Sequence, residues 1–276
     1  MNAVNAVNAI NAINASALTY AYGQSSVLND ISFSVRKSDF FIIIGPNGSG
    51  KTTLMKILAG IERPASGTVE IMNRPLHGYS RKDLARIVAF VPQTVSMDFP
   101  FTVLEVVLMG RSPHLGMLGL HERKDLDIAV QALAFTGVEH LAGRSIAQLS
   151  GGERQRVFIA RAICQEPDVI FLDEPTAALD LAHQVRVMDL MEKMKHEKGI
   201  TVVMVSHDVN LAAMYGDQLL LIKEGKIVSL GRPDEVLTFE TLETAYGCTL
   251  LVDESPMGKV PRVTLVPRKF MNADRR

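Results

Sequence analysis

The chain has 276 residues, of which 47% are hydrophobic and 21% are charged, and its formal net charge is −1. This composition is typical of a globular protein with a substantial core, and it lacks the basic excess that would favour nucleic acid as a partner. No apolar stretch is long enough to cross a bilayer, so any membrane role has to go through a partner chain. Cys164 and Cys248 have no metal-binding or redox spacing, and we expect two reduced thiols in a cytosolic chain.

The first fourteen residues are a low-complexity run of Asn-Ala-Val and Asn-Ala-Ile triplets. The run lacks the basic start of a secretory signal, and its asparagines interrupt any apolar core. We predict a loosely ordered extension over residues 1–14, with a functional arm as the alternative, and a folded domain over 15–247.

The pattern of the first hundred residues predicts short strands. Alternation of apolar and polar residues over 17–22 and 31–35 is typical of half-buried antiparallel strands. The apolar run over 40–44 indicates a buried strand, and further strands are expected over 68–72 and 88–91.

Helical patterns then dominate from about residue 95 to residue 160, where Thr102 and Glu105 have the spacing of a capping box. After this insertion, strand-like apolar runs alternate with helical segments, which is the rhythm of a parallel sheet covered on both faces. These runs lie at 168–172, 201–205 and 218–222. A tail over 248–276 carries two more strand-like runs, separated by a turn at 255–258.

Residues 45–52 match the phosphate-binding loop pattern G-x-x-x-x-G-K-[ST] at each fixed position, between a predicted strand and a predicted helix. Glycines let the backbone curl so that several N–H groups face one anion, and the helix start adds partial positive charge. Lys51 can reach the β- and γ-phosphates, and the Thr52 hydroxyl can ligate Mg²⁺. The predicted nucleotide contacts in this loop are Gly45, Pro46, Asn47, Gly48, Ser49, Gly50, Lys51, Thr52 and Thr53.

The loop alone indicates only nucleotide binding, and a second set of motifs is more specific. Residues 149–156, Leu-Ser-Gly-Gly-Glu-Arg-Gln-Arg, resemble the signature motif of ATP-binding-cassette (ABC) ATPases. The family's other motifs have counterparts in the same order: Tyr22 for the adenine-stacking aromatic, Gln93 for the Q-loop, Asp173 and Glu174 for Walker B, residues 178–180 with Asp180 for the D-loop, and His207 for the switch histidine.

This resemblance covers roughly residues 16–247. It implies an α/β fold: a P-loop NTPase core with a mainly parallel sheet, an N-terminal antiparallel β subdomain and an α-helical insertion.

Physical chemistry gives a reason for each acidic or polar candidate. Asp173 ends a buried strand beside the phosphates and can hold Mg²⁺, while Glu174 can activate the attacking water. Gln93 can accept a hydrogen bond from that water or bind Mg²⁺, and His207 can donate to the γ-phosphate. The alternatives are an acidic pair in a turn, a solvated glutamine and a structural histidine.

The adenine-stacking position has two candidates two residues apart on one strand. Tyr22 is preferred because Gly23 follows it, as in the family pattern. Tyr20 stays open as the stacking residue, and Tyr22 would then be an ordinary strand tyrosine.

The signature residues Ser150, Gly151 and Gly152 resemble a second anion-binding nest at a helix start. The resemblance implies a head-to-tail homodimer in which two ATP molecules lie between the phosphate loop of one copy and the signature of the other. Asp180 is included among the predicted nucleotide contacts.

Two further stretches resemble the ATPase subunits of bacterial and archaeal importers for iron-siderophore, haem and cobalamin. They are residues 107–114, with the element Gly110-Arg111-Ser112-Pro113-His114, and the tail segment 231–247. The resemblance implies an ATPase bound to two permease subunits at the cytoplasmic face of the inner or plasma membrane, served indirectly by a substrate-binding protein and without nucleic acid. Residues 110–114 are expected to contact the permease, or simply to end a helix and begin a loop.

Two other functions remain open from the sequence. One is a soluble ABC ATPase of DNA repair or translation, although such chains carry coiled-coil insertions, tandem cassettes or basic arms, and none is visible in this sequence. The other is a motor for a different metal substrate. No residue selects the substrate, since the substrate would never touch this chain.

Overall fold

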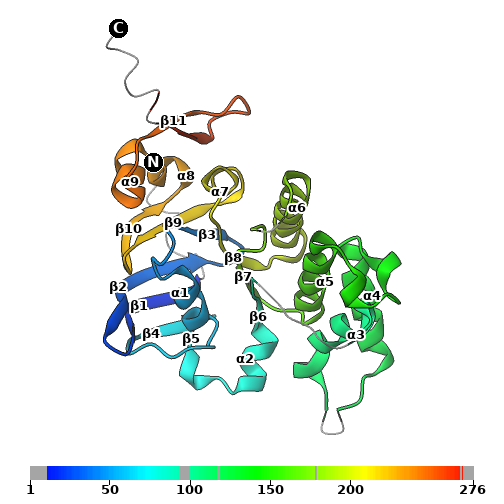
Figure 1. Ribbon diagram of the computed structural model, residues 1–276. Helices are drawn as coiled ribbons and strands as arrows, with labels where there is room; N and C mark the ends of the chain where they lie inside the picture. The colour runs from blue at the N-terminus through cyan, green and yellow to red at the C-terminus, as the bar shows by residue number, and fades with distance from the viewer. Residues whose placement is uncertain (1–10, 94–99, 117–118, 178, 268, 270–276) are drawn as a thin grey trace, which may run out of the picture.

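The computed structural model describes residues 11–93, 100–116, 119–177, 179–267 and 269. Figure 1 shows a β-rich core on one side and a lobe of helices on the other. Among the described residues, no helix is both long enough and apolar enough to span a membrane.

The central sheet has the strand order β10-β9-β3-β8-β7-β6. All neighbours in it pair in parallel except β10, which joins β9 as an antiparallel edge. Every residue of β3, β7 and β8 is buried, as expected where helices or a second sheet cover both faces. The strands are β3 (Phe40–Ile44), β6 (Val88–Val91), β7 (Val169–Asp173), β8 (Thr201–Val205), β9 (Gln218–Lys223) and β10 (Lys226–Gly231).

A second, antiparallel sheet with the order β2-β1-β4-β5 packs beside the core. Its strands are β1 (Asn11–Tyr22), β2 (Ser25–Arg36), β4 (Ser66–Ile71) and β5 (Arg74–Pro75). A third sheet is the C-terminal hairpin of β11 (Leu250–Glu254) and β12 (Pro261–Leu265), which confirms the two strand-like runs predicted for the tail.

Two hydrophobic clusters lie on opposite faces of the central sheet, and alternate residues of β3 reach them in turn. Phe41 and Ile43 face the cluster that includes α1 and the antiparallel sheet. Phe40, Ile42 and Ile44 face the larger cluster, which includes residues of the helices α3 to α9. The period-2 alternation of strand side chains therefore fixes one layer on each face.

The helices follow the predicted order, and the main ones are labelled in Figure 1. The α-helices are α1 (Lys51–Leu58), α2 (Arg81–Ile87), α3 (Val103–Leu108), α4 (Arg123–Phe135), α5 (Gly151–Cys164), α6 (Leu181–Lys198), α7 (Val209–Tyr215), α8 (Pro233–Val236) and α9 (Phe239–Tyr246). Short 3₁₀ turns are η1 (Leu76–Gly78), η2 (Met109–His114), η3 (Glu139–Leu141) and η4 (Ile146–Gln148). The predicted capping box is confirmed, since Thr102 and Glu105 bond reciprocally at the start of α3.

The helical lobe consists of α3, α4, α5 and the turns that join them. The buried side chain of Arg111 in η2 holds these elements together. Its guanidinium donates to Asp125 Oδ1 of α4 at 2.9 Å and to the Cys164 carbonyl at the end of α5 at 2.8 Å. It also reaches Glu166 Oε2 at 2.8 Å. Arg111 therefore has a structural role inside the lobe, beyond the helix-ending turn expected from the sequence.

The N-terminal extension is shorter than predicted. Residues 1–10 lie outside the described part of the chain, but 11–14 are not loosely ordered, because β1 begins at Asn11. Ile13 is buried and pairs with Val35 on one side and Ile71 on the other. The asparagines fit the strand because Asn11 donates to Asn14 Oδ1 at 2.8 Å, so polar groups that would disrupt an apolar core satisfy each other.

Candidate functional site

The phosphate loop, residues 45–52, connects β3 to the first turn of α1. Gly45 has φ +146°, and a Cβ there would lie 2.1 Å from the Ile222 carbonyl oxygen. Only glycine therefore lets the loop backbone pass so close to strand β9. Ser49 is buried, and its hydroxyl has no hydrogen-bond partner. A buried unpaired donor in a loop of this shape is the group that a bound anion would satisfy.

Lys51 is 5% exposed and folds back over the loop. Its Nζ donates to the carbonyl oxygens of Gly45 at 2.9 Å and Pro46 at 2.8 Å. Burial lowers the pKa of Lys51, while the nearby charges of Glu174 and Asp173 act in the opposite direction. The ammonium group is thus already next to the loop, held by two carbonyl groups that an anion can replace.

Thr52 in the first turn of α1 and Asp173 at the end of β7 lie next to each other, as expected from the sequence for a shared magnesium site. The Thr52 hydroxyl donates to Asp173 Oδ1 at 3.1 Å. Asp173 is 5% exposed, and burial raises the pKa of its carboxyl group, whereas the bond from Thr52 lowers it. A hydroxyl and a buried carboxylate side by side are two hard oxygen donors of the kind that Mg²⁺ prefers.

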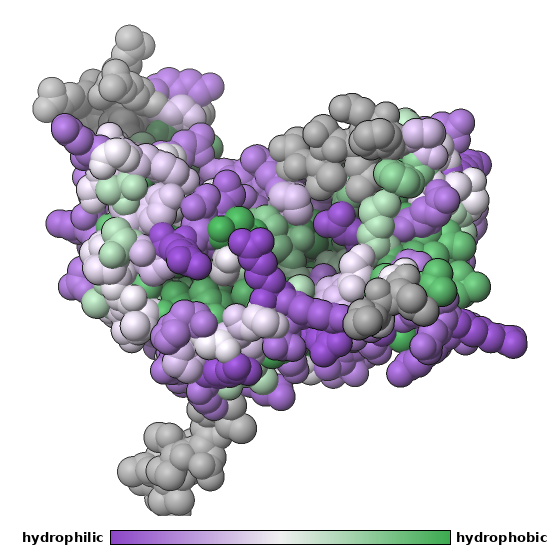
Figure 2. Space-filling model, turned by 90° about the horizontal axis from the view of Figure 1, so that it is seen from below, coloured by the Kyte–Doolittle hydropathy of each residue, from purple (hydrophilic) through white to green (hydrophobic). Residues whose placement is uncertain are grey.

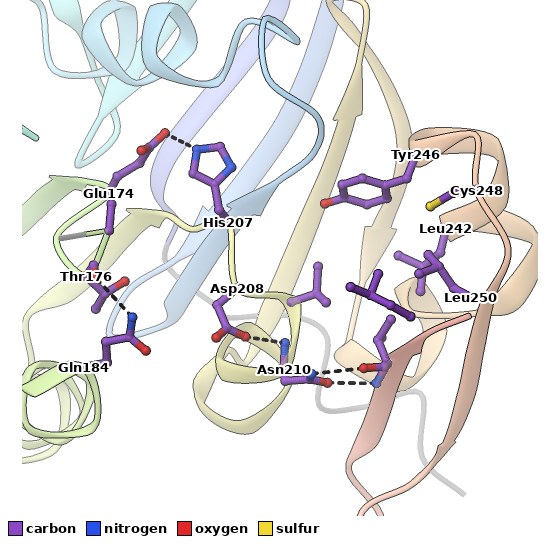
Figure 3. A pocket seen from close by; sticks show the side chains of 14 residues that line it. Glu174, Thr176, Gln184, His207, Asp208, Asn210, Leu242, Tyr246, Cys248 and Leu250 are labelled. Carbon is purple, nitrogen blue, oxygen red and sulfur yellow. Dashed lines mark hydrogen bonds and ion pairs between the residues drawn. The ribbon is translucent and has the colours of Figure 1, made fainter. Parts of the chain in front are cut away.

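Glu174 is the point where three predicted residues converge. Its Oε2 accepts from Gln93 Nε2 at 2.6 Å, and its Oε1 lies 2.5 Å from His207 Nε2. Gln93, Glu174 and His207 follow β6, β7 and β8 respectively, so the carboxyl ends of three parallel strands bring them together. Figure 3 shows the contact between Glu174 and His207.

The backbone of Glu174 is itself unusual. Its φ is +51°, a left-handed conformation that costs a residue with a Cβ about 1–3 kcal/mol. Such conformations concentrate at functional sites, where the surroundings hold them in place. The two side-chain contacts to the carboxylate supply that support.

Glu174 lines two cavities that concern the predicted nucleotide site. One, of about 370 Å³, lies over the phosphate loop and is lined by residues 47–53 together with Val27, Glu174 and His207. The other, of about 550 Å³, lies between Gln93 and the start of α5, where Gly151 contributes to its wall. The face shown in Figure 2 is hollowed between the core and the helical lobe, with hydrophobic residues gathered in the hollow.

The signature residues line no part of the cavity over the phosphate loop of their own chain. Ser150 caps α5 in a reciprocal box with Glu153, whose Oε2 accepts from the Ser150 backbone at 2.9 Å. Hydrogen bonds from Ser150 lower the pKa of Glu153. Gly151 faces open space, with no atom within 4 Å of the position of a Cβ.

His183 joins the signature helix to the D-loop, and the sequence analysis did not single it out. A Cβ on Gly152 would lie 2.5 Å from the His183 ring. Asp180 caps α6 by accepting from the His183 backbone at 2.8 Å and from its Nδ1 at 2.7 Å. The spacing Asp180-x-x-His183 at a helix start was the available signal, because a cap commonly bonds to the third residue beyond it.

The two tyrosines near the loop differ in exposure and bonding. Tyr22 is 53% exposed, whereas Tyr20 is partly buried and its hydroxyl donates to Glu62 Oε2 at 3.3 Å. Their rings contact edge to face with centroids 5.0 Å apart. Tyr22 therefore has a ring surface open to a stacking partner, and Tyr20 is largely occupied by its own packing.

The chain is similar to known proteins over most of its length. Residues 28–177 match the family model described as "ABC transporter". The chain is 36% identical over 251 residues to the ferric enterobactin transport ATP-binding protein FepC of Escherichia coli (strain K12), with 91% of this chain and 93% of that protein covered. It is 42% identical over 244 residues to the hemin import ATP-binding protein HmuV of Gloeobacter violaceus, covering 86% and 88% respectively.

Solved structures are similar over most of the chain. An ABC transporter assigned to the metal-chelate type, in an inward-facing conformation, gives a TM-score of 0.84 at 32% identity and covers 95% of this chain and 99% of that one. The dimeric post-hydrolysis state of the ATP-binding cassette MJ0796, bound to ADP and Pi, gives a TM-score of 0.70 at 30% identity, covering 80% and 98%.

Proposed function

Because the chain belongs to the ABC transporter family, we propose that it is the ATP-hydrolysing subunit of an importer for an iron chelate, haem or cobalamin. The names of the relatives support the substrate class, since FepC is a ferric enterobactin protein and HmuV a hemin import protein. The observation that carries the ATPase function is the Glu174 carboxylate, held by Gln93 and His207 beside the phosphate loop.

Each residue of the site has a defined task in this reaction. The phosphate loop and Lys51 bind the β- and γ-phosphates, and Lys51 exchanges its two carbonyl partners for phosphate oxygens. Glu174 takes a proton from the attacking water as the water oxygen bonds to the γ-phosphorus. The bond between that phosphorus and the bridging oxygen breaks, which leaves ADP and phosphate. Gln93 orients the water, and His207 donates to the γ-phosphate.

The donor set fits Mg²⁺ as a companion of the nucleotide. Thr52 and Asp173 would hold the ion, which would neutralise charge on the phosphates. Within the described residues there is no cluster of three or more His, Cys, Asp or Glu side chains able to hold a metal alone. Phosphate oxygens would therefore complete the ligand set.

The complete catalytic unit is proposed to be a head-to-tail homodimer. None of Ser150, Gly151 and Gly152 lines the cavity over the phosphate loop, and Gly151 lines the other cavity, which supports a site that a second copy completes. The dimeric cassette bound to ADP and Pi shows that a protein of this fold forms dimers. In this arrangement Tyr22 stacks on adenine, and Asp180 lies at the interface close to the nucleotide. Hydrolysis then removes contacts that join the two copies.

The remaining partners follow from the importer role. Two permease subunits would bind the dimer at the cytoplasmic face of the membrane, and a substrate-binding protein would deliver the cargo. Arg111 is buried within the helical lobe, so its guanidinium group would not touch the permease. The contact would instead come from the exposed part of the segment 110–114, such as Ser112.

Glu174→Gln tests the ATPase function directly. An amide fills the same space but cannot take the proton, so turnover should fall about 10²-fold or more while ATP still binds. Glu197→Gln is the matched control, because it makes the same charge change at an exposed position on α6. Hydrolysis by the Glu174→Gln variant at the rate of the control would contradict the assignment of the base.

The importer role needs a separate test in the native host. A strain lacking the gene is complemented with the wild-type chain or with Glu174→Gln, and uptake of labelled ferric siderophore, haem and cobalamin is measured. Rescue of one uptake by the wild type alone identifies the cargo. Unchanged uptake of all three in the deletion strain would contradict the proposed substrate class.

A further inference from the structure

The C-terminal hairpin forms a sheet of its own and is attached to the core through helices. Among the described strands, β11 and β12 pair with each other and with no third strand, while β12 packs on α7 and β11 packs on α9. The hairpin lies at the α7–α9 end of the core in Figure 1. Leu250 and Val263 are buried in the large hydrophobic cluster, so the hairpin is anchored against the core.

Asn210 in α7 fastens the hairpin with a pair of hydrogen bonds. Its Nδ2 donates to the Val263 carbonyl at 3.1 Å, and its Oδ1 accepts from the Val263 N–H at 2.8 Å. A side-chain amide carries a donor group and an acceptor side by side, so it can pair with the N–H and C=O of one strand residue, as a neighbouring strand would. Figure 3 shows both bonds at Asn210.

The same residue belongs to the turn that carries His207. The Asp208 side chain caps α7 by accepting from the backbone N–H groups of Asn210 and Leu211, both at 2.9 Å. Asp208 N–H in turn donates to Ser206 Oγ at 3.1 Å. His207 is therefore held in the middle of a bonded turn, between the end of β8 and the residue that fastens the hairpin.

The His207 ring depends on this turn for its position, because a cavity opens beside it. The cavity has a volume of about 520 Å³, with Glu174 and His207 at one end and Leu242 and Leu250 at the other, and Val263 also lines it. The His207 side chain is 41% exposed, and its Nε2 bonds to the Glu174 carboxylate. The position of the ring therefore depends on its bond to Glu174 and on the backbone turn that carries it.

We propose that Asn210 is a positioning residue, which sets the place of His207 by joining its turn to the C-terminal hairpin. The inference rests on the proposed role of His207 in hydrolysis. Loss of the amide leaves the Val263 N–H and C=O without these partners and releases the turn from the hairpin. The hairpin thereby becomes part of the catalytic apparatus without touching the nucleotide.

A double-mutant cycle tests this coupling on the full-length chain, with kcat and KM for ATP as readouts. Asn210→Ala should lower kcat about tenfold with KM within about twofold, as expected when a reacting group is misplaced by a fraction of an ångström. In a His207→Ala background, the same change should lower kcat by less than about twofold, because its effect passes through His207. Asn210→Asp keeps the size of the side chain but loses its N–H donor, so its kcat should fall as much as that of Asn210→Ala. This variant provides the test if Asn210→Ala does not fold.

Asp253→Ala is the matched control within the hairpin. It removes the paired bonds from Arg262, at 2.8 and 2.6 Å, but leaves Asn210 and Val263 intact, so kcat should stay within about twofold of wild type. If Asn210→Ala still lowers kcat tenfold in the His207→Ala background, the coupling between Asn210 and His207 is wrong. Wild-type kcat in both Asn210→Ala and Asn210→Asp would also overturn it. Wild-type kcat in His207→Ala alone would instead overturn the proposed role of His207.

Discussion

Replacing Arg111 with methionine should destabilise the helical lobe strongly. The change removes a guanidinium that bonds to Asp125, to the Cys164 carbonyl and to Glu166. Removing one partner of a buried ion pair costs about 3–5 kcal/mol, because the other charge stays buried. We expect the lower end, about 3 kcal/mol, since the Asp125 side chain keeps a bond from the Glu122 N–H at 3.0 Å. Glu166 adds less than about 1 kcal/mol, because its side chain is 55% exposed.

Urea unfolding at pH 7, followed by circular dichroism, measures this loss. Arg123→Met is the matched control at an exposed position of α4, and it should change stability by less than about 0.5 kcal/mol. Adding Asp125→Asn to Arg111→Met should recover part of the loss, since no buried charge then remains unpaired. An Arg111→Met variant as stable as Arg123→Met would refute the structural role of this arginine.

Two further predictions concern the signature helix and acid stability. Gly152→Ala should lower the midpoint of thermal unfolding, because its methyl group would lie 2.5 Å from the His183 ring. Gly151→Ala should leave the midpoint unchanged, because its methyl group would point into open space. Equal midpoints for the two variants in calorimetry would contradict this. The pKa of the Asp125 carboxyl group is lowered mainly by the bond from the Glu122 N–H and further by Arg111. The ionised carboxylate therefore stabilises the folded protein fully above the pKa of the unfolded state, about 4. This contribution is lost as the pH falls through the lower pKa of the folded state. The stability difference between wild type and Asp125→Asn should therefore shrink below about pH 4, and a constant difference in urea titrations would count against the pairing.

Sequence reasoning succeeded where the signal is local or follows from strand order. The phosphate loop is a continuous motif between a strand and a helix, so its position in the fold followed directly. Gln93, Glu174 and His207 are far apart in the chain, yet each follows a parallel strand of one sheet. The family resemblance implied that these residues share a site, and the strand order explains it, because parallel strands align their carboxyl ends.

The sequence was uninformative where a residue's role depends on distant partners. The strand that begins at Asn11 forms because Ile13 pairs with Val35 on one side and with Ile71 on the other. The sequence pattern of residues 1–14 does not predict these distant partners. The contact of Asn210 with Val263 spans 53 positions and joins a side chain to a backbone group, which leaves no repeating pattern.

Arg111 gave a similar difficulty. A charged residue after a helix-ending glycine is usually exposed, and only the placement of Asp125 and Glu166 explains its burial.

A mixed-dimer experiment tests the central proposal, a composite ATP site, most directly. Two variants are made in the Glu174→Gln background: Lys51→Ala damages the phosphate loop, and Gly151→Glu places a charge where the partner's ATP would lie. Gly151 is chosen because its own chain leaves the site open. The two variants are mixed with ATP, dimer mass is measured by size exclusion with light scattering, and bound ATP is measured by extracting the nucleotide from the dimer fraction. We predict that neither variant dimerises alone and that the mixture forms a dimer holding one ATP. A monomeric mixture, or dimers of Gly151→Glu alone holding two ATP molecules, would contradict the composite site.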